Sequence, residues 1–406
     1  MNSTLRTGTA LLALMSVAAC TAINQPRNLE PVAVGNGYQA QYREPKRDIR
    51  EQTFLRSEEI NRLKCRPLIG GAEGNGSKFG GLASASLRGE RLSRNDLIDI
   101  RVAEDDTFSG DYVVSRDGTL NLPYLRPIRA QGRLVRDVEA DLATQLVKNG
   151  FYDAAPRISV RVADFASVTV GVSGAVFEPK AVEIGGIAGD QVDSRRQEAL
   201  GASTEARNLS AALRATGGVR PDADISAIQL RRGSKVYTLD MRGVFEGQNA
   251  VDVMLLTGDE INVPSRGCFQ DDLMRPSPIS PPGVTLFLSN LTQPATGNAP
   301  SAIGREVREI PYGTRYMQAV IDTNCVGGTR TTNAHRSAAL YTRNPMTGVS
   351  AVVERDIESM MRRADRDDYD PFVLPGDAIA CYDSGVTNIA DIGRVLGIVG
   401  VVALIP

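Results

Sequence analysis

The sequence of 406 residues has no tryptophan, a single histidine at position 335 and no Cys-x-x-Cys pair. One histidine cannot build a multi-histidine metal site, and without paired cysteines neither a zinc site nor thioredoxin-like redox chemistry is expected. His335 lies in a polar stretch rich in Arg, Thr and Asn, so we expect an exposed loop or strand-end residue and not a catalytic base. The sequence therefore predicts neither a metal site nor a cofactor.

An excess of charge of one sign is missing too. The chain has 46 basic and 48 acidic residues, which gives a formal net charge of −2. Nucleic-acid-binding domains usually present a basic surface, so nucleic acid is not expected as a partner. The length is sufficient for two or three domains, each with its own hydrophobic core.

The first residues of the chain predict its compartment. Arg6 gives a positive start, residues 10–19 are apolar, and Val17-Ala18-Ala19-Cys20 has the form of a lipobox. We interpret residues 1–19 as a secretory signal peptide that resembles those of bacterial lipoproteins, with Cys20 as the acylated first residue of the mature chain. Thr21 is not Asp, which by analogy with lipoprotein sorting favours the outer membrane. The alternative is an ordinary secreted protein with an incidental cysteine.

Four further cysteines remain: Cys65, Cys268, Cys325 and Cys381. In an oxidising periplasm an even number predicts disulfides, and the sequence alone allows three pairings. Residues 20–90 are polar, with several prolines and a glycine-rich stretch at 70–81. The stretch lacks the Gly-Lys-Ser/Thr order of a phosphate loop, so we expect an extended tether followed by a flexible linker.

Residues 92–163 contain three local signals in a fixed order. A short β-branched apolar run predicts a strand, an Asp-Gly pair predicts a tight hairpin through positive φ angles, and a four-residue apolar period predicts a helix that ends at Lys148-Asn149-Gly150. A further strand is predicted at residues 158–163. The apolar residues of the first three elements are, in order, Leu97, Ile98, Ile100 and Val102; Tyr112, Val114, Leu120 and Leu122 around Asp117-Gly118; and Leu134, Val135, Val138, Leu142 and Leu146.

This order resembles the export domain of the Wza-type outer-membrane polysaccharide export lipoproteins. The matching residues are 92–100 (LSRNDLIDI), 114–120 (VSRDGTL), Leu122-Pro123, Gly132 and 156–160 (PRISV). One departure is Asn95, where the family more often has Gly before the Asp. The resemblance implies an α+β protein whose export domain, at residues 91–166, combines mixed strands with one helix.

The chain then repeats itself. Each copy opens with an apolar strand, continues with a short helix, a glycine pair and a strand pair, and closes on a Gly-Asp phrase, which indicates two copies of one supersecondary unit. The elements of the first and second copies are the opening strands at 168–176 and 284–289, the helices at 209–215 and 316–322, the glycine pairs at 217–218 and 327–328, the strand pairs at 227–230 with 236–239 and 338–342 with 349–353, and the closing phrases at 256–261 and 374–379.

The two copies resemble the soluble-ligand-binding β-grasp domains that follow the export domain in the Wza-type family. We therefore expect β-grasp-like domains at 167–270 and 284–386, joined by a Pro-rich linker at 271–283 that cannot be a central strand. Cys325 and Cys381 would then both lie in the second domain, which leaves Cys65 and Cys268 to tie down the N-terminal segment. This pairing is a hypothesis among the three.

Two segments near the C-terminus remain. The charged run at 362–370 lacks the spacing of a calcium loop, so we expect a solvated or subunit-facing segment. Residues 387–406 end in an apolar stretch, and a helix over 388–406 would be just under ~30 Å long, near the thickness of a bilayer core. Gly393, Gly397 and Gly400 would line one face and let helices pack closely in a membrane. The resemblance implies a ring of such helices across the outer membrane; the alternative is a helix packed on its own domain.

The resemblance implies a non-enzymatic function. We expect an oligomeric, ring-forming outer-membrane lipoprotein, mostly periplasmic, that exports capsular or exopolysaccharide together with an inner-membrane polysaccharide copolymerase. The alternative is a monomeric glycan-binding accessory lipoprotein of the periplasm, which has no need of the apolar tail. A polysaccharide-modifying enzyme is not expected, because Asp105 and Asp106 are adjacent and do not face each other across a cleft, and no nucleophile–His–acid set can be placed.

Overall fold

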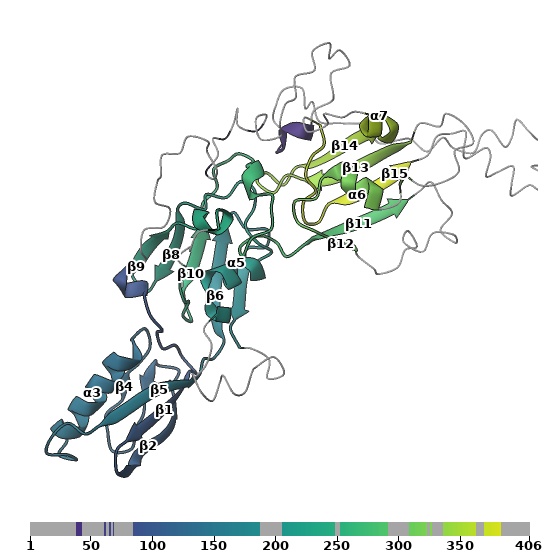
Figure 1. Ribbon diagram of the computed structural model, residues 1–406. Coiled ribbons are helices and arrows are strands. Elements are labelled where there is room, and N and C mark those ends of the chain that lie inside the picture. Colours follow the sequence, from purple (N-terminus) through teal and green to yellow (C-terminus); the bar gives the residue numbers. More distant parts are fainter. Residues whose placement is uncertain are drawn as a thin grey trace, which may run out of the picture. The chain divides into compact units, whose positions relative to one another are not determined.

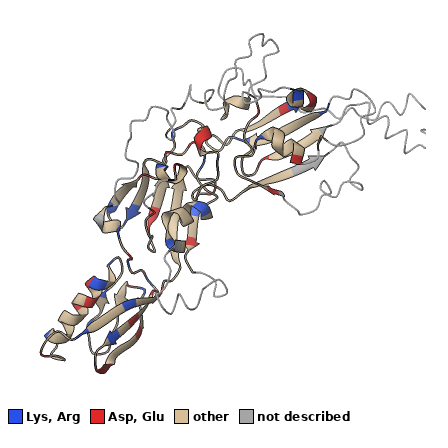
Figure 2. Cartoon of the chain, in the orientation of Figure 1, with Lys and Arg blue, Asp and Glu red and all other residues tan. Residues whose placement is uncertain are grey.

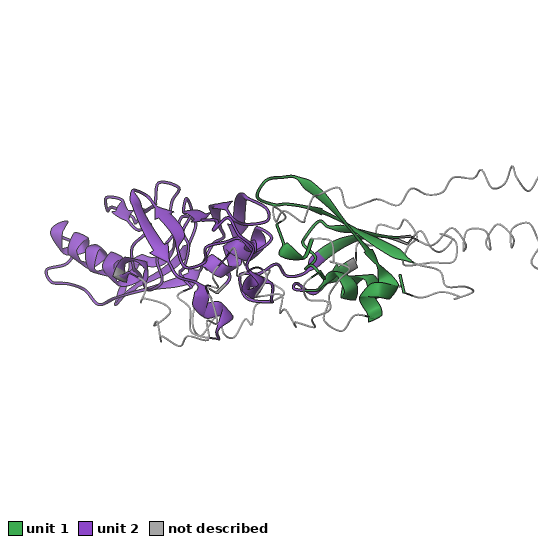
Figure 3. Cartoon of the chain, turned by 90° about the horizontal axis from the view of Figure 1, so that it is seen from above, with its two compact units in different colours: residues 1–55, 285–310, 314–406 green, residues 56–284, 311–313 purple. Residues whose placement is uncertain are grey.

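The computed structural model (Figure 1) describes residues 38–42, 61, 65, 68, 84–186, 205–247, 252–290, 308–322, 325–326, 336–362 and 369–382. The chain divides into two compact units (Figure 3). Unit 2 comprises residues 56–284 and 311–313 and contains the export domain and the first repeat. Unit 1 comprises residues 1–55, 285–310 and 314–406 and contains the second repeat. Helices and mixed sheets occur in both units, which confirms the predicted α+β class.

The export domain is built on a three-stranded antiparallel sheet in the order β2-β1-β5, with a two-stranded ladder of β3 and β4 beside it. Helix α3 packs its apolar stripe of Val138, Leu142 and Leu146 into the same core as β1 and β5 (Figure 1). The elements are β1 (Leu97–Val102), β2 (Asp105–Val113), β3 (Thr119–Leu120), β4 (Ile128–Arg129), α3 (Val135–Lys148) and β5 (Ile158–Asp164).

The predicted helix and its stop are confirmed, because α3 ends at Lys148 and Gly150 takes a φ of 77°. The predicted hairpin needs a correction. Residues 115–119 do form a tight turn, in which the Ser115 amide donates to the Thr119 carbonyl, but β2 and β3 belong to different sheets. Only Gly118 of the Asp-Gly pair has a positive φ, and an added Cβ there would lie 2.7 Å from the Gln131 side chain. The turn thus moves the chain from one sheet to the next.

The first repeat is a five-stranded sheet in the order β7-β6-β10-β8-β9, in which β10 runs parallel to β6 and antiparallel to β8. Helix α5 occupies the predicted residues and packs Leu209, Ala212 and Leu213 into the core. The elements are β6 (Val168–Gly174), β7 (Lys180–Ile184), α5 (Leu209–Ala215), β8 (Ile228–Arg232), β9 (Lys235–Leu239) and β10 (Glu260–Val263).

The second repeat has the same topology, with the sheet order β12-β11-β15-β13-β14 and β15 parallel to β11. Helix α6 again occupies the predicted residues. The elements are β11 (Val284–Asn290), β12 (Arg308–Ile310), α6 (Tyr316–Asp322), β13 (Ser337–Arg343), β14 (Ser350–Asp356), α7 (Ile357–Arg362) and β15 (Ala378–Tyr382). Short 3-10 helices lie at Ala40–Tyr42, Ala85–Leu87, Glu205–Arg207, Arg242–Phe245 and Asp271–Leu273.

The two repeats also match at the level of single hydrogen bonds. The first amide of each helix donates to a backbone carbonyl that precedes the closing phrase, of Val253 for α5 and of Pro371 for α6. The second amide donates to an aspartate carboxylate, Asp252 in one repeat and Asp370 in the other, at 3.0 and 2.9 Å. These bonds satisfy helix amides that have no partner within the helix. The repeat inferred from the sequence is therefore one structural unit used twice.

Two predicted loops are more ordered than expected. Asp370 was expected in a solvated charged run, but it is buried because its carboxylate accepts the Met317 amide at the start of α6. The predicted Pro-rich linker is also partly buried. Ile279 lies in the core of the first repeat, and its carbonyl accepts the Val219 amide beyond the Gly217-Gly218 pair. Gly218 has a φ of 82° and lies against Pro281, so no side chain would fit there. Residues 363–368 lie outside the described part of the chain.

The N-terminal segment, expected to be a tether, contributes to both units. In unit 1 Gln39 is buried, and so are Gln41 and Tyr42 of the 3-10 helix at Ala40–Tyr42. The Gln39 side-chain amide donates to the Phe372 carbonyl and accepts the Phe372 amide, both at 2.7 Å. In unit 2 the Asn61 side chain donates to the Asp271 carboxylate. Parts of this segment are therefore integral to the folded units.

Candidate functional site

The turn that begins the export domain is organised by the Asp96 carboxylate. Asp96 is fully buried and accepts hydrogen bonds from the Ser93 amide at 2.6 Å and the Ala166 amide at 3.1 Å. Asn95, the residue that departs from the family pattern, has a φ of 67°. Gly adopts this conformation without strain, and Asn is among the few other residues that tolerate it. The departure therefore preserves the turn.

Asp96 forms a buried ion pair with Arg207 of the first repeat. The Arg207 Nη1 atom donates to Asp96 at 2.7 Å and to the Ala166 carbonyl at 3.2 Å, and its guanidinium lies over the Phe165 ring at 5.2 Å. Burial raises the pKa of the Asp96 carboxyl, whereas the Arg207 charge and the hydrogen bonds lower it. A buried pair of this kind fixes geometry, because removing one partner leaves the other charge unpaired in a low-dielectric interior. Within unit 2, Asp96 and Arg207 thus join the export domain to the first repeat.

The same turn recurs where each repeat closes. In all three turns an aspartate carboxylate accepts the amide of the residue three positions earlier: Ser93 to Asp96, Leu256 to Asp259 at 2.9 Å, and Leu374 to Asp377 at 2.8 Å. The residue before the aspartate has a positive φ in each turn, and a strand follows at once. The Asn-Asp and Gly-Asp phrases noted in the sequence therefore start the strands β1, β10 and β15.

One end of the export domain exposes aromatic side chains. Tyr124 is 80% exposed and has a φ of 61°, so its backbone is held in an unusual conformation that presents the ring to solvent. Its ring centroid lies 6.4 Å from that of Phe151, which follows α3, and Phe151 packs edge-on against Phe108 of β2 at 5.1 Å. Aromatic rings combine a flat apolar face with low side-chain entropy, and such a face can stack on the C–H side of a sugar ring. We call Tyr124 and Phe151 the aromatic tip.

Polar groups support the aromatic tip. The Tyr152 hydroxyl donates to the Asp105 carboxylate, which raises the pKa of Tyr152 to about 12 and lowers the pKa of Asp105. Tyr112 donates to the Phe108 carbonyl at 3.1 Å. Charges of both signs occur in this domain (Figure 2), but they do not alternate. Helix α3 has Arg136 and Lys148 with three acidic residues between them, whereas the charged residues of β2 are all acidic.

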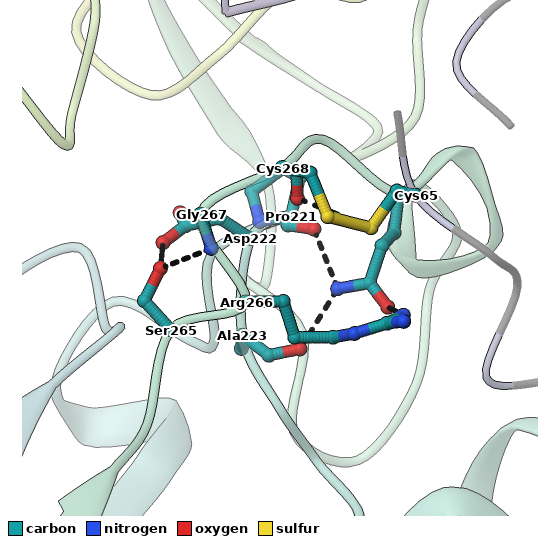
Figure 4. The surroundings of a disulfide bond; sticks show 9 residues. Cys65, Pro221, Asp222, Ala223, Ser265, Arg266, Gly267 and Cys268 are labelled. Carbon is teal, nitrogen blue, oxygen red and sulfur yellow. Dashed lines mark hydrogen bonds between the residues drawn. A yellow bond between two sulfur atoms is a disulfide. The ribbon is translucent and has the colours of Figure 1, made fainter. Parts of the chain in front are cut away.

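The structure joins the cysteines in the pairs that we favoured as a hypothesis. Cys65 is bonded to Cys268 with their Cα atoms 5.6 Å apart, and Cys325 to Cys381 with Cα atoms 5.9 Å apart. Around the first disulfide (Figure 4) the loop is held by Ser265, which donates to Asp222, and by Gln270, which donates to the Pro221 and Ala223 carbonyls. Disulfides typically stabilise a fold by about 2–4 kcal/mol. Cys65 thereby fixes the N-terminal segment on the first repeat.

Several predicted site residues lie outside the described part of the chain: the lipidation residue Cys20, His335, and the glycines Gly393, Gly397 and Gly400. Their roles remain predictions. Among the described residues, no group of three or more His, Cys, Asp or Glu side chains is placed to hold a metal ion. No helix of the described segments is long and apolar enough to cross a membrane.

Sequence reasoning missed Arg207, Tyr124 and the burial of Asp96. Arg207 follows a stretch without a clear apolar period, so a structural role for its charge had no local signal. Tyr124 is preceded by Pro123, and a Pro-Tyr pair in a turn gives only a weak indication of an exposed ring. The Asn-Asp phrase and the two Gly-Asp phrases could have indicated a buried acceptor, because an aspartate follows Asn or Gly at all three strand starts.

Comparison with known proteins identifies the export domain. Residues 85–163 match the family model of polysaccharide biosynthesis/export proteins. The chain is 29% identical over 197 residues to the EPS I polysaccharide export outer membrane protein EpsA of Ralstonia nicotianae, which covers 47% of this chain and 46% of that protein. The EpsA protein of Ralstonia solanacearum is 29% identical over 194 residues, which again covers 47% of this chain and 46% of that protein.

These matches confirm the resemblance to Wza-type export proteins over the export domain, where strand, turn and helix all lie at the expected positions. The chain spans about half the length of the curated relatives that it matches. The relatives are named as outer membrane proteins, in agreement with the expected localisation, and they are named for export and not for an enzymatic activity.

Proposed function

We propose that this chain, which carries a polysaccharide export domain of the Wza type, is an outer-membrane lipoprotein that assembles into a ring and conducts capsular or exopolysaccharide from the periplasm to the cell surface. The observation that carries the proposal is the export domain, because family match, fold and turn geometry coincide over residues 85–163. Cys20 would anchor the mature chain through its acyl groups, and the bulk of the chain would lie in the periplasm. The two repeats would be the β-grasp domains that follow the export domain.

The physical task of such a conduit differs from catalysis. A moving polymer must meet many weak contacts and no deep site, since a tight site would stop it. The aromatic tip suits this task because an exposed ring stacks weakly on sugar rings, and this stacking depends little on how the hydroxyl groups of the sugar are arranged. We propose that Tyr124 contacts the polymer, and that an inner-membrane polysaccharide copolymerase is the partner that delivers it.

The first experiment is the native mass of the detergent-extracted mature protein, supported by particle images. A closed ring of many subunits is expected. A monomer under gentle extraction would contradict the conduit and favour a glycan-binding accessory lipoprotein, since the repeats could bind glycan without a channel. The apolar segment at 388–406 argues for the ring, because a soluble binding protein has no need of it.

A substitution at the tip tests the contact with polymer. Tyr124→Ala should lower the amount of polysaccharide exported by cells that carry the variant as their only copy, because the stacking surface is lost. Assembly and protein level should stay unchanged, since an 80% exposed ring contributes little to the core. Val113→Ala, at an exposed apolar position of the same domain, is the matched control and should leave export unchanged. Normal export by Tyr124→Ala would remove the tip from the proposed path.

A further inference from the structure

The identical topology of the two repeats allows their strand positions to be compared one by one. In the first repeat Glu260 of β10 lies beside Gly171 of β6 and Arg231 of β8. In the second repeat Ala378 of β15 lies beside Phe287 of β11 and Tyr341 of β13. Successive side chains of a strand point to opposite faces, so these residues all lie on the face that is turned away from the core. We call it the outer face of each sheet.

The outer face changes its character from one repeat to the next. In the first repeat it is polar: Arg231 forms an ion pair with Glu260, and Asn262 contacts Gln229 and Ser173. In the second repeat five of the equivalent positions are apolar, whereas the position of Ser173 and Ser289 is polar in both repeats and that of Val236 and Val352 is apolar in both. The replacements, first repeat before second, are Gly171 and Phe287, Glu260 and Ala378, Asn262 and Ala380, Gln229 and Ala339, and Arg231 and Tyr341.

We define the outer patch as Phe287, Ala339, Tyr341, Val352, Ala378 and Ala380. Ala339 and Ala380 form a small apolar cluster of their own, on which Tyr341 and Val352 pack, whereas Phe287 is 55% exposed. Helix α6 lies on the other face, because Cys325 just beyond it is bonded to Cys381, which alternates with Ala380 along β15. Ala339 and Ala380 are themselves buried, Tyr341, Val352 and Ala378 are half-buried, and Phe287 is the exposed member of the patch. An exposed apolar ring on the sheet face that is turned away from the core marks the point that a partner surface would cover.

The opposite side of the same unit offers a second apolar feature. Ile321, near the end of α6, is 52% exposed. Both features have charged neighbours: Arg343 follows Tyr341 on the outer face, Glu354 lies beside Ala339, and Asp322 follows Ile321. An apolar centre with a polar rim is the usual anatomy of a protein interface, and the basic Arg343 complements the acidic Asp322. Because the two features lie on opposite sides of one unit, a contact between them repeats from copy to copy.

We propose that the outer patch of the second repeat binds the α6 side of the second repeat in a neighbouring copy of this chain. The contact is head-to-tail, so it generates a closed ring when the rotation between copies closes. The proposal deepens the proposed function and rests on it, since it names the surface through which the ring would assemble. We expect no equivalent contact from the first repeat, because most of these positions on its outer face are polar.

Cross-linking of the full mature protein tests the geometry. Phe287→Cys and Ile321→Cys are combined in one chain, and a short bis-maleimide is added to the detergent-extracted protein. Both positions are more than half exposed, so the fold tolerates the change. We expect a ladder of dimers, trimers and larger species, because each copy uses both of its features. Bands that stop at the dimer, or no bands between copies, would overturn the head-to-tail contact. Val236→Cys with Ile321→Cys, which uses an exposed residue of the first repeat, is the control and should give no ladder.

A charge at the patch tests its contribution. Phe287→Glu should weaken association at least about 30-fold in native mass measurements, as loss of a central contact residue does. Val236→Glu is the matched control and should leave assembly unchanged. If wild type forms rings and Phe287→Glu forms them equally well, the patch is not the interface and the proposed function stands. If wild type is a monomer, the proposed function itself fails.

The lack of tryptophan supplies a direct probe of what covers the patch. Phe287→Trp introduces the only indole of the chain. Its emission should move to shorter wavelength on assembly and back on dilution, whereas Trp at Val236 should stay solvent-like. A short-wavelength emission that persists in the monomer and is lost when residues 383–406 are removed would assign the patch to the chain's own C-terminal segment. Quenching by brominated phosphatidylcholine vesicles would assign it to lipid. Either result would overturn the proposal.

Discussion

The two repeats build the same sheet, yet they stabilise the turn before their parallel strand in different ways. In the first repeat the Asp259 carboxylate accepts the Leu256 amide and is paired with Arg232 at 2.7 Å. In the second repeat Asp377 accepts the Leu374 amide, but no ion pair to it is found among the described residues. Burial therefore raises the pKa of Asp377 to about 7. Both turns therefore use a carboxylate oxygen as hydrogen-bond acceptor, but among the described residues only the carboxylate of the first repeat is also paired with a positive charge.

The repeats also differ in the residue that lies two positions before the helix. In the first repeat the Leu255 amide donates a hydrogen bond to the Arg207 carbonyl. In the second repeat the equivalent bond runs from the Val373 amide to the Thr314 carbonyl. Arg207 reaches Asp96 of the export domain, whereas a threonine is too short for a comparable ion pair. One position of a shared framework thus serves as a joint between domains in the first copy only.

The largest effect is expected from breaking that joint. Asp96→Asn removes the charge that Arg207 needs, and an unpaired buried charge costs about 3–5 kcal/mol. We expect a loss of this size in the free energy of unfolding of unit 2, measured by urea unfolding. Hydrogen exchange should locate the loss in β1 and α5. Asp117→Asn, at an exposed turn of the same domain, is the control and should change stability by less than about 0.5 kcal/mol. Equal stability of the two variants would show that the joint contributes nothing.

The next largest effect is expected at the closing turns, whose contributions to the free energy of unfolding should depend differently on pH. The folded pKa of Asp377, about 7, lies above its ordinary value of 3.8, so its contribution to stability is full below about pH 4 and is lost as the pH rises through 7. The loss is at most about 4 kcal/mol. Asp377→Asn should remove this pH dependence in urea unfolding at about pH 5 and about pH 8.

Asp259→Asn is the matched variant of the first repeat. It should destabilise unit 2 by about 1.5–3 kcal/mol at neutral pH, because Arg232 loses a charged partner. The comparison of the turns would be wrong if Asp377→Asn cost as much at neutral pH as Asp259→Asn.

The smallest effect is expected at the helix starts. Asp252→Ala and Asp370→Ala each remove the carboxylate that accepts the second amide of α5 or α6, which should cost about 0.5–2 kcal/mol. The cost should be higher for Asp370, which is buried, than for the exposed Asp252. Thermal melting of each variant measures the difference. The Asp→Asn variants are the controls, since Asn caps helices equally well; a melting temperature that falls as far for Asn as for Ala would exclude the capping role.

Local signals predicted the regular elements well. Helix α3 follows from its apolar period and glycine stop, and α5 and α6, predicted from the internal repeat and its glycine pairs, occupy the predicted residues. The export domain was predicted from its strand, turn and helix in sequence order. These features depend on residues that are neighbours in the chain.

Apart from the pairing of the cysteines, features that depend on distant residues were not predicted. Asp96 and Arg207 are 111 residues apart, and no local sequence pattern near either residue predicts that they form a pair. Asp370 was interpreted as solvated because its neighbours in the chain are charged, yet its carboxylate is fixed by the Met317 amide, 53 residues away. The segment 271–283 was interpreted as a linker from its prolines, and the space beside Gly218 that receives Pro281 exists only in the folded repeat. A polar group can be buried only where a partner satisfies it, and local sequence patterns do not show which distant residue that partner is.

The clamp between Gln39 and the Phe372 backbone has a consequence for biogenesis. The two residues are 333 positions apart, so unit 1 cannot close until nearly the whole chain has been made. At ordinary synthesis rates this interval is roughly 15–70 s. Throughout this interval Tyr42, which is buried in the finished protein and hydrogen-bonded to Thr342, has not yet met that residue. The export domain and the first repeat can fold earlier, because the residues that build them lie between Gln39 and Phe372 in the chain. The order of synthesis therefore leaves the N-terminal segment without its contacts to the second repeat until that repeat emerges.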